Sequence, residues 1–428
     1  MTYTETIEYL FNSTPVFEKI GAAAYKEGLS NTHLLDAHFG HPHTQFRSIH
    51  IAGTNGKGSC SHTLAAILQA EGYRVGLYTS PHIVDFRERI RVNGRMISEE
   101  YVVDFVATHR HFFEPLQPSF FELTTAMAFK YFAEEKVDFA IIEVGLGGRL
   151  DCTNIIQPLL SIITNISLDH TQFLGDTMAA IAHEKAGIIK PNTPVIIGEA
   201  TPETRIVFEA TAQAQNALIT FAEDQPAILH ATTTAVGTMH YETRFLGNFE
   251  GALGGTYQAK NANTILTAAM HLYNHHVIRK PESIAKGFRE VIERTGLLGR
   301  WQIIRPSEPR IVCDTGHNDA AWQQLAPQIM AEPCQTLRLV FGMVDDKDLL
   351  SVMQRLPQKA VYYWTQPTTK RAFPVERIAA LGKQLGLQGT AFPTVKAAYD
   401  TALADASPQD FIFIGGSNYV VSDLFSCF

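Results

Sequence analysis

Apolar positions along the chain follow two different periods. Short runs rich in Ile, Val and Leu are apolar throughout, which indicates strands buried on both faces of a parallel sheet. The expected strands of the first part are residues 48–53, 74–80, 137–145, 158–166 and 193–200. Segments with helical periodicity lie between them, near 57–71, 98–112, 121–136 and 176–189. This alternation predicts a doubly wound, mostly parallel α/β sheet, in which ligands lie beyond the carboxyl ends of the strands.

The pattern changes over residues 222–258, where β-forming residues are interrupted by glycines. We expect a small antiparallel patch there on the first domain, then helices near 260–275 and 281–294. The two glycines within 295–302 are typical of a linker. Strands expected at 310–316, 336–343, 359–366 and 410–416 then alternate with helices again. We therefore predict an N-terminal α/β domain over 1–296 and a smaller, Rossmann-like α/β domain over 297–428.

Composition narrows the classes of protein to consider. The chain has 428 residues, is 45% hydrophobic and 18% charged, and so has enough apolar surface for two cores. A net charge of −8 argues against nucleic acid or an anionic membrane as a partner. The five cysteines form no C-x-x-C pair, which favours reduced thiols over disulfides or a zinc site. With an acidic N-terminus and no long apolar run, we expect a cytoplasmic protein with no membrane segment.

Residues 50–68, HIAGTNGKGSCSHTLAAIL, place a glycine-rich loop between a strand end and a helix. Backbone N–H groups of such a loop and the N-terminus of the helix bind phosphate, and Lys57 adds a positive charge. The alternative is a tight strand-to-helix turn without a ligand. In the usual P-loop a Ser or Thr hydroxyl follows the lysine and holds Mg²⁺, but here Gly58 follows Lys57. A metal oxygen must therefore come from another segment.

Ser80 and Glu143 are the candidates from neighbouring strands. Ser80 follows the strand expected at 74–80, so its hydroxyl should lie at the same edge as the glycine-rich loop. The alternative for Ser80 is an ordinary turn serine. Glu143 lies among apolar residues near a strand end, where a carboxylate is costly unless it is paired or binds a metal. Its alternative is an arginine pair, and the glycines of 145–148 should let a loop approach a ligand closely.

Two further pairs are less specific. Asp169 and His170 come shortly after the strand expected at 158–166, where a hydrogen-bonded loop histidine is as consistent as a ligand. Glu184 and Lys185 lie on one helical turn, for which a solvated face is the favoured interpretation.

The second domain contributes three polar candidates. Asp314 and His317 lie in DTGHN at the end of an expected strand, and Arg300 lies in the linker. Such a cation can reach a nucleotide, but loop polar residues without a ligand remain the alternative.

Six stretches, taken in order, resemble folylpolyglutamate synthase and its bifunctional dihydrofolate synthase relative, a family related to the Mur ligases. They are HIAGTNGKGS, YTSPHIVDFRERIRVNG, FELTTAMAF, IIEVGLGGRLDCTN, LDHTQFLGDTMAAIAHEKAGIIK and DTGHN. The resemblance runs from about residue 5 to the end of the chain and makes the loop with K-G-S this family's own form of the P-loop.

The resemblance implies a role for each matching residue. Nucleotide contacts would come from Gly53, Thr54, Asn55, Gly56, Lys57, Gly58, Ser59, Asn261, Arg300 and Asp314, with His317 near the phosphates. Ser80, Glu143 and His170 would bind Mg²⁺, and Lys185, carried as a carbamate, would bind a second Mg²⁺. Pterin and aminobenzoate would contact Phe121, Glu122, Asp151 and Cys152. Relatives usually have Ala or Ser at the position of Cys152, which leaves the folate preference open.

The implied reaction is ATP-dependent amide formation by a monomeric enzyme. An acceptor carboxylate attacks the γ-phosphate, and the amine of L-glutamate then displaces phosphate from the acyl phosphate. The acceptor would be a folate, and dihydropteroate as well, with Lys57, Lys185 and His317 as the catalytic residues. Three alternatives stay open: a P-loop NTPase without a second substrate, a non-catalytic nucleotide-binding protein, and a Mur-type ligase acting on another carboxylate.

Overall fold

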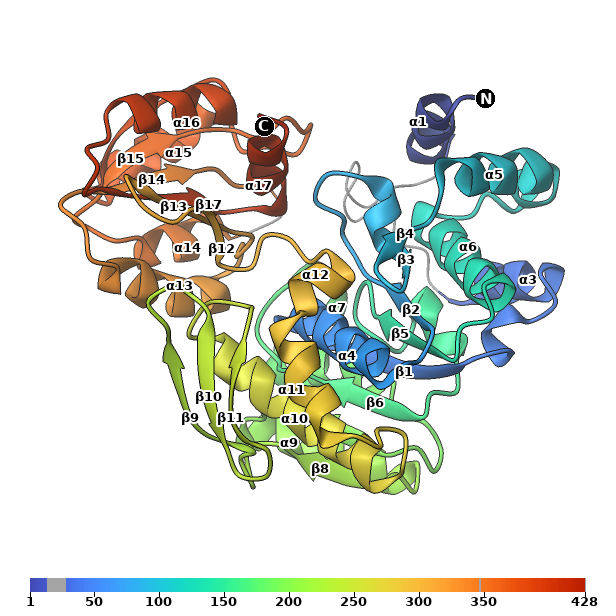
Figure 1. Ribbon diagram of the computed structural model, residues 1–428. Coiled ribbons are helices and arrows are strands. Elements are labelled where there is room, and N and C mark those ends of the chain that lie inside the picture. Colours follow the sequence, from blue (N-terminus) through green and yellow to red (C-terminus); the bar gives the residue numbers. More distant parts are fainter. Residues whose placement is uncertain (14–27, 346–347, 428) are drawn as a thin grey trace. The chain divides into compact units, whose positions relative to one another are not determined.

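The computed structural model describes residues 1–13, 28–345 and 348–427. The chain divides into two compact units (Figure 1). Unit 1 comprises residues 1–231, 241–252 and 259–296, and unit 2 comprises 232–240, 253–258 and 297–428.

Unit 1 is built on an eight-stranded sheet with the order β4-β3-β2-β5-β1-β6-β7-β8. Its strands are β1 (Arg47–Ala52), β2 (Val75–Tyr78), β3 (Ile90–Val92), β4 (Arg95–Met96), β5 (Phe139–Glu143), β6 (Leu160–Ile163), β7 (Val195–Ile197) and β8 (Ile219–Phe221). In this order, every neighbouring pair from β2 to β8 is parallel. At the other edge, β3 pairs antiparallel with both β2 and β4. The expected doubly wound, mostly parallel sheet is therefore confirmed.

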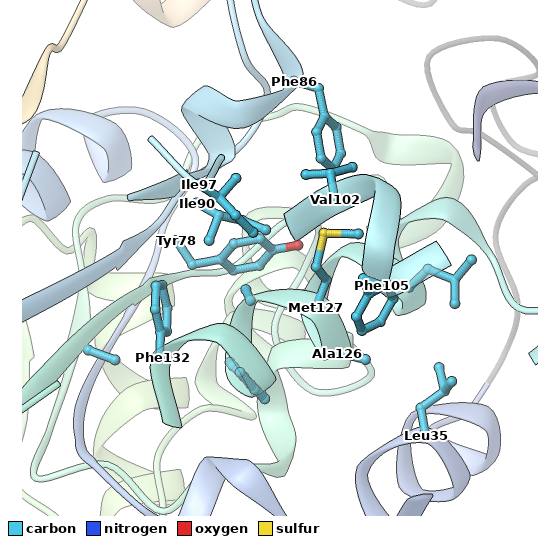
Figure 2. Packing of buried hydrophobic residues seen from close by; sticks show 14 of the residues in the cluster. Leu35, Tyr78, Phe86, Ile90, Ile97, Val102, Phe105, Ala126, Met127 and Phe132 are labelled. Carbon is cyan, nitrogen blue, oxygen red and sulfur yellow. The ribbon is translucent and has the colours of Figure 1, made fainter. Parts of the chain in front are cut away.

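Helices cover both faces of this sheet. The helices in this part of the chain are α1 (Tyr3–Ser13), α3 (Ser30–His38), α4 (Lys57–Glu71), α5 (Glu99–Phe113), α6 (Phe120–Glu134), α7 (Thr171–Leu174), α8 (Met178–Ala186), α9 (Pro202–Ala214), α10 (Gln258–Asn274), α11 (Pro281–Arg289) and α12 (Val291–Thr295). Some of them, such as α1 and α3, pack on other helices rather than on the sheet. The side chains of Ser98 and Ser119 cap the first turns of α5 and α6 by accepting backbone hydrogen bonds. Figure 2 shows how Met127 and Phe132 of α6 pack beside Tyr78 of β2 in the core on one side. Buried residues of α8 and α9 join β6 and β7 in a second cluster.

Three consecutive strands form the small sheet expected within 222–258: β9 (Ile228–Thr233), β10 (Met239–Thr243) and β11 (Gly247–Gly251), in the order β11-β10-β9. Connections of so few residues join only antiparallel strands. The patch does not belong wholly to the first part of the chain, because residues 232–240 and 253–258 group with unit 2.

Unit 2 contains a six-stranded sheet with the order β12-β13-β17-β14-β15-β16. Its strands are β12 (Gln302–Arg305), β13 (Arg310–Asp314), β14 (Leu337–Phe341), β15 (Val361–Trp364), β16 (Gln388–Ala391) and β17 (Phe411–Gly415). All pairs are parallel except β12 with β13. The helices are α13 (Asp319–Ala331), α14 (Leu349–Arg355), α15 (Val375–Gln384), α16 (Val395–Ala404) and α17 (Asn418–Phe425), which confirms a second α/β fold.

The helices and the cysteines were also searched for a membrane segment and for disulfides. Among the described ranges, no helix combines the length and apolar character needed to cross a membrane. All five cysteines are free thiols.

Candidate active site

The strand order of unit 1 brings four candidate segments to one edge of the sheet. The strands β2, β5, β1 and β6 are consecutive neighbours and run parallel. Their carboxyl ends therefore meet at the same edge. Ser80 follows β2, Glu143 ends β5, the glycine-rich loop follows β1, and the segment leading to His170 follows β6.

The glycine-rich loop is held in shape by the segment that follows β6. Thr54 donates its backbone N–H to the carbonyl oxygen of Asn165 at 2.9 Å, and Asn55 donates its own to Asn165 Oδ1 at 3.0 Å. The hydroxyl of Thr164 donates to the carbonyl oxygen of Asn55 at 2.6 Å. The loop is thus held by hydrogen bonds to the segment that follows β6.

Glycine is required at two positions of this loop. Gly53 has φ of 142° and Gly56, just before α4, has φ of 83°, both in the range that favours glycine. A Cβ atom on Gly53 would lie 1.8 Å from Thr164 Oγ1, and one on Gly56 would lie 2.2 Å from Asn261 Oδ1. Asn261 of α10 therefore lies directly against the loop, where the resemblance implied a nucleotide contact.

Two lysines converge on one carbonyl oxygen of the loop. Lys57 Nζ donates to the Gly53 oxygen at 3.0 Å and to the Thr54 oxygen at 3.1 Å. Lys185 Nζ, from α8, donates to the same Gly53 oxygen at 3.0 Å. Lys185 is only 5% exposed, so the favoured interpretation of a solvated helix face is wrong. Two polar residues on one helical turn do not reveal which side of the helix faces the sheet.

The environment of Lys185 favours the neutral amine. Burial, followed by the nearby charge of Lys57, lowers the pKa of Lys185 to about 7. The carboxylates of Asp169 and Asp151 act in the opposite direction but are outweighed. The neutral amine of Lys185 is therefore accessible near neutral pH, unlike that of a surface lysine.

Ser80 and Glu143 are brought into contact. The backbone N–H of Ser80 donates to Glu143 Oε2 at 3.2 Å. Glu143 is 4% exposed and pairs in register with Ile51, two residues before Gly53. The buried Glu143 carboxylate and Ser80 thus lie at the strand ends that also carry the glycine-rich loop. Carboxylate and hydroxyl oxygens suit Mg²⁺.

His170 lies on the loop side of β6. It has a left-handed φ of 49° and precedes α7. Its backbone N–H donates to Asp169 Oδ1 at 2.9 Å, and its ring Nε2 lies 3.9 Å from the same atom. The side chain is 26% exposed, so it is accessible to a ligand. Within the described residues, no group of three or more His, Cys, Asp and Glu side chains is arranged to hold a metal ion.

The glycines after Glu143 lie close against other parts of the protein. A Cβ on Gly145 would lie 2.4 Å from the ring of Phe121. A Cβ on Gly148 would lie 2.8 Å from the carbonyl oxygen of Glu184, at the end of α8. These glycines make room for Phe121 and α8, and the close approach of this loop to a ligand stays a prediction. The Glu184 side chain accepts a hydrogen bond from Arg149 at 2.9 Å.

The buried carboxylate of Asp151 organises the same loop. Its Oδ2 accepts the backbone N–H groups of Gly145 at 3.0 Å and of Leu146 at 2.9 Å. Its Oδ1 accepts the backbone N–H of Thr153 at 3.0 Å. Burial raises the pKa of Asp151, although these hydrogen bonds oppose the change.

Glu122 and Cys152, which the resemblance also placed at the pterin and aminobenzoate, lie in well-defined surroundings. Glu122 is buried, and its carboxylate accepts the backbone N–H of Ser119 at 2.6 Å, which completes the cap of α6. Cys152 begins the short helix η5 (Cys152–Ile155). Burial, with the charges of Asp151 and Glu122, raises the pKa of the Cys152 thiol well above its usual range. Near neutral pH this thiol therefore carries its proton.

Unit 2 holds a separate polar cluster at the end of β13. Asp314 Oδ2 accepts the hydroxyl of Tyr257 at 2.6 Å and the backbone N–H of Trp301 at 2.7 Å. Its Oδ1 accepts the backbone N–H of Gly316 at 2.8 Å. Burial raises the pKa of Asp314, and the charge of Arg300 opposes that effect.

Arg300 and His317 join this cluster through one threonine. The guanidinium of Arg300 donates to the Thr315 hydroxyl and to the carbonyl oxygen of Gly299. The ring Nδ1 of His317 donates to the carbonyl oxygen of Thr315 at 3.0 Å. The three candidates of the second domain are thus brought together within unit 2.

Sequence reasoning missed several residues that shape the site. Thr164 and Asn165 hold the glycine-rich loop, and Tyr257 binds Asp314. The position of Thr164 and Asn165 directly after β6, next to β1, is a signal that could have found them. Tyr257 lies 57 residues from Asp314 in sequence, and no local pattern indicates that contact.

Two domain families and several relatives match this sequence. The Mur ligase middle domain matches residues 51–269, and the Mur ligase, glutamate ligase domain matches residues 299–418. The folylpolyglutamate synthase of Lacticaseibacillus casei is 34% identical over 99% of this chain and 97% of its own length. A Haloferax volcanii protein named "Probable bifunctional folylpolyglutamate synthase/dihydropteroate synthase" is 32% identical over 99% of this chain. The chain spans 50% of that relative's length.

Solved structures agree in fold over the full chain. Escherichia coli FolC in complex with DHPP and ADP has a TM-score of 0.83 at 30% identity, covering 100% of this chain and 97% of that one. A bifunctional folylpolyglutamate synthase/dihydrofolate synthase with Mn, AMPPNP and L-glutamate bound has a TM-score of 0.82 at 27% identity, covering 100% and 98%. The chain therefore belongs to the folylpolyglutamate synthase/dihydrofolate synthase family of ATP-dependent ligases, which are built from Mur ligase domains.

Proposed function

We propose that this chain uses ATP to join L-glutamate to the carboxylate of a folate, and that dihydropteroate is a second acceptor. One observation carries the proposal: the edge where Ser80 contacts Glu143 also holds the loop on which Lys57 and Lys185 converge. The names of the relatives and the nucleotide and L-glutamate bound in the FolC-type structures support the choice of substrates.

The chemistry follows from the poor reactivity of a carboxylate toward an amine. An acceptor carboxylate oxygen attacks the γ-phosphorus of ATP, the bond to the β-phosphate oxygen breaks, and ADP leaves. The amine of L-glutamate then attacks the acyl phosphate carbon, loses a proton, and inorganic phosphate departs. Lys57 and the backbone N–H groups of 55–59 stabilise charge on the transferred phosphoryl group.

We assign the remaining candidates within this scheme. Nucleotide contacts come from residues 53–59 and Asn261, and from Arg300 and Asp314, with His317 acting near the phosphates. The acceptor lies against Phe121, Glu122, Asp151 and Cys152. Residues 1–296 form the ATP-binding domain and 297–428 the glutamate-ligase domain, an assignment supported by the two family matches. The enzyme acts as a monomer in the cytoplasm.

Ser80, Glu143 and His170 offer donors that suit one Mg²⁺. A second Mg²⁺ at Lys185 fits only if Lys185 is not an ammonium ion, since a cation repels a cation. Carbamylation resolves this: the neutral amine of Lys185 attacks the carbon of CO₂ and releases a proton, and the product carries an anionic oxygen. The lowered pKa of about 7 supplies the neutral amine. When bound, the metal neutralises charge on the phosphates.

Labelled CO₂ tests the modification directly. After equilibration with ¹³C-bicarbonate, we expect a carbamate carbon resonance in the wild-type protein and its loss in the Lys185→Arg variant. A resonance that persists in Lys185→Arg would place the modification on another amine.

Phosphate release tests the function. With ATP, Mg²⁺ and L-glutamate present, we expect stimulation by tetrahydrofolate and by dihydropteroate over the rate without acceptor. Equal phosphate release with and without acceptor would instead indicate an NTPase, and no release at all would indicate a binding protein. Stimulation by neither folate acceptor overturns the proposal.

A further inference from the structure

A buried histidine in β1 has no part in the site described so far. His50 is 0% exposed and lies three residues before Gly53. Its Nε2 lies 2.9 Å from Thr153 Oγ1, on a segment more than a hundred residues away in sequence. A buried imidazole is worth explaining, because burial of a polar ring is costly unless it is hydrogen-bonded.

The direction of the hydrogen bonds can be deduced. The hydroxyl of Thr153 donates its single hydrogen to Asp151 Oδ1. Its oxygen must then accept from His50, so His50 carries its hydrogen on Nε2. The other ring nitrogen, Nδ1, is buried without a hydrogen-bond partner among the described residues. Burial, with the charge of Lys190, lowers the pKa of His50 to about 3, so the ring is a neutral donor at any working pH.

The chain of hydrogen bonds ends at the loop beside the proposed acceptor site. From His50 it passes through Thr153 to Asp151, whose Oδ2 accepts the N–H groups of Gly145 and Leu146. The ring of Phe121 lies against Gly145 with no room for even a methyl group between them. This hydrogen-bond relay, from His50 through Thr153 to Asp151, therefore links the centre of the sheet to the backbone that lies against Phe121.

We propose that His50 is a positioning residue for the acceptor: acting through Thr153, it fixes the Asp151 carboxylate and with it residues 145–146 under Phe121. The identity of the acceptor rests on the function proposed above. His50 touches no reacting atom, and its effect reaches the substrate only through this relay. The relay also gives Asp151 a hydroxyl donor held in one orientation, which stabilises the ionised carboxylate.

Kinetics with two kinds of variant test the relay. Thr153→Val removes the hydroxyl donor to Asp151, and we expect the acceptor KM to rise about tenfold with little change in the ATP KM. His50→Leu should raise the acceptor KM by a smaller factor, about threefold. His50→Gln can keep a donor near the Nε2 position and should restore most of the difference. In the Thr153→Val background, His50→Leu should have no further effect on the acceptor KM, because its route to Asp151 is already cut.

The protein contains a matched control. His62 in α4 is also buried and donates from Nδ1 to the Thr295 hydroxyl at 2.8 Å, and that hydroxyl donates to the carbonyl oxygen of Val291. His62→Leu removes the same kind of hydrogen bond, but that bond leads to α12 rather than to Asp151. It should therefore lower the melting temperature to a similar extent as His50→Leu and leave the acceptor KM unchanged.

Amide hydrogen exchange gives a readout that does not depend on turnover. Exchange of the Gly145 and Leu146 amides should accelerate in His50→Leu and Thr153→Val, and stay at the wild-type rate in His62→Leu. If wild-type protein turned over neither folate acceptor, the proposed function would fail while this exchange pattern still tested the relay. The relay is overturned if these amides exchange normally in His50→Leu, or if the KM effects of His50→Leu and Thr153→Val are additive.

Discussion

Two lysine ammonium groups on one backbone oxygen are an unusual arrangement at the scale of single residues. Lys57 and Lys185 both donate to the Gly53 carbonyl oxygen at 3.0 Å. Their charges repel each other, and a buried ammonium is also deprived of water. The protein can keep both side chains there because Lys185, the more buried of the two, releases its proton easily.

This shift makes stability depend on pH in a defined direction. The pKa of Lys185 is about 7 in the folded protein and close to 10.5 in the unfolded chain. Between these values the unfolded chain binds more protons, so wild-type stability rises with pH. Below pH 7 the full penalty is present, on the order of 4 to 5 kcal/mol. Lys185→Met should lose this slope, as measured by urea unfolding without metal, nucleotide or CO₂. Unfolding free energies that run parallel to wild type across this pH range would refute the assignment.

Lys57 gives a second prediction at this scale. Lys57→Ala should reduce ligation by at least about a hundredfold, because it removes the positive charge at the phosphates. Circular dichroism and the melting temperature should stay close to wild type, since Lys57 is only partly buried. The same variant should raise the pKa of Lys185, because the charge of Lys57 helps to lower it. Retained turnover in a folded Lys57→Ala protein would contradict this role.

At the scale of elements, helix α4 begins and ends with a left-handed glycine. Gly56 precedes the helix with φ of 83°, and Gly72 follows it with φ of 104°. The two differ in surroundings: a Cβ on Gly56 would meet Asn261 Oδ1 at 2.2 Å, whereas nothing lies within 4 Å of one on Gly72. They therefore form a matched pair for separating backbone strain from crowding.

Alanine at each position separates the two effects. Gly72→Ala should cost about 1 kcal/mol of unfolding free energy from the left-handed backbone alone. Gly56→Ala should cost more than Gly72→Ala and should weaken ADP binding, because Asn261 or the loop must move. Chemical denaturation and calorimetric ADP titration measure both quantities. Equal ADP affinity in the two variants would show that this contact does not shape the loop.

The sequence predicts elements well where burial dominates. The apolar runs around β1, β5 and β6 correspond to strands whose residues are almost all buried, and α4 begins and ends where the pattern placed it. Short, exposed or edge strands such as β4 and β16 were missed, because partners elsewhere in the sheet define them. The packing of the glycines within 145–148 could not be predicted for a similar reason, since their neighbours come from α6 and α8.

At the scale of the whole molecule, each unit carries its own core and its own polar cluster. Strand order explains why distant candidates gather: Ser80 and Glu143 are 63 residues apart in sequence, yet adjacent strands bring them into contact. The sequence could predict that edge, because parallel strands share it. It could not predict that Lys185 is buried or that His50 connects to Asp151, because both depend on packing between distant segments.

A substitution in one unit should lower the local stability of that unit and leave that of the other unchanged. Tyr257→Phe removes one of three hydrogen bonds to the buried Asp314 carboxylate in unit 2. We expect faster amide exchange in β13, equivalent to about 1 to 3 kcal/mol of lost local stability. Amides of β1 and β5 in unit 1 should keep their wild-type rates. Equal acceleration in both units would show that they open as one.

We propose that an acceptor carboxylate is activated by phosphoryl transfer at the edge formed by the glycine-rich loop, Ser80 and Glu143. The most direct test of this proposal follows the carboxylate oxygen, using an acceptor whose reacting carboxylate carries ¹⁸O. During turnover with ATP, Mg²⁺ and L-glutamate, we expect one labelled oxygen to appear in each inorganic phosphate released. Phosphate that forms at the same rate but takes its new oxygen from water would contradict the proposal.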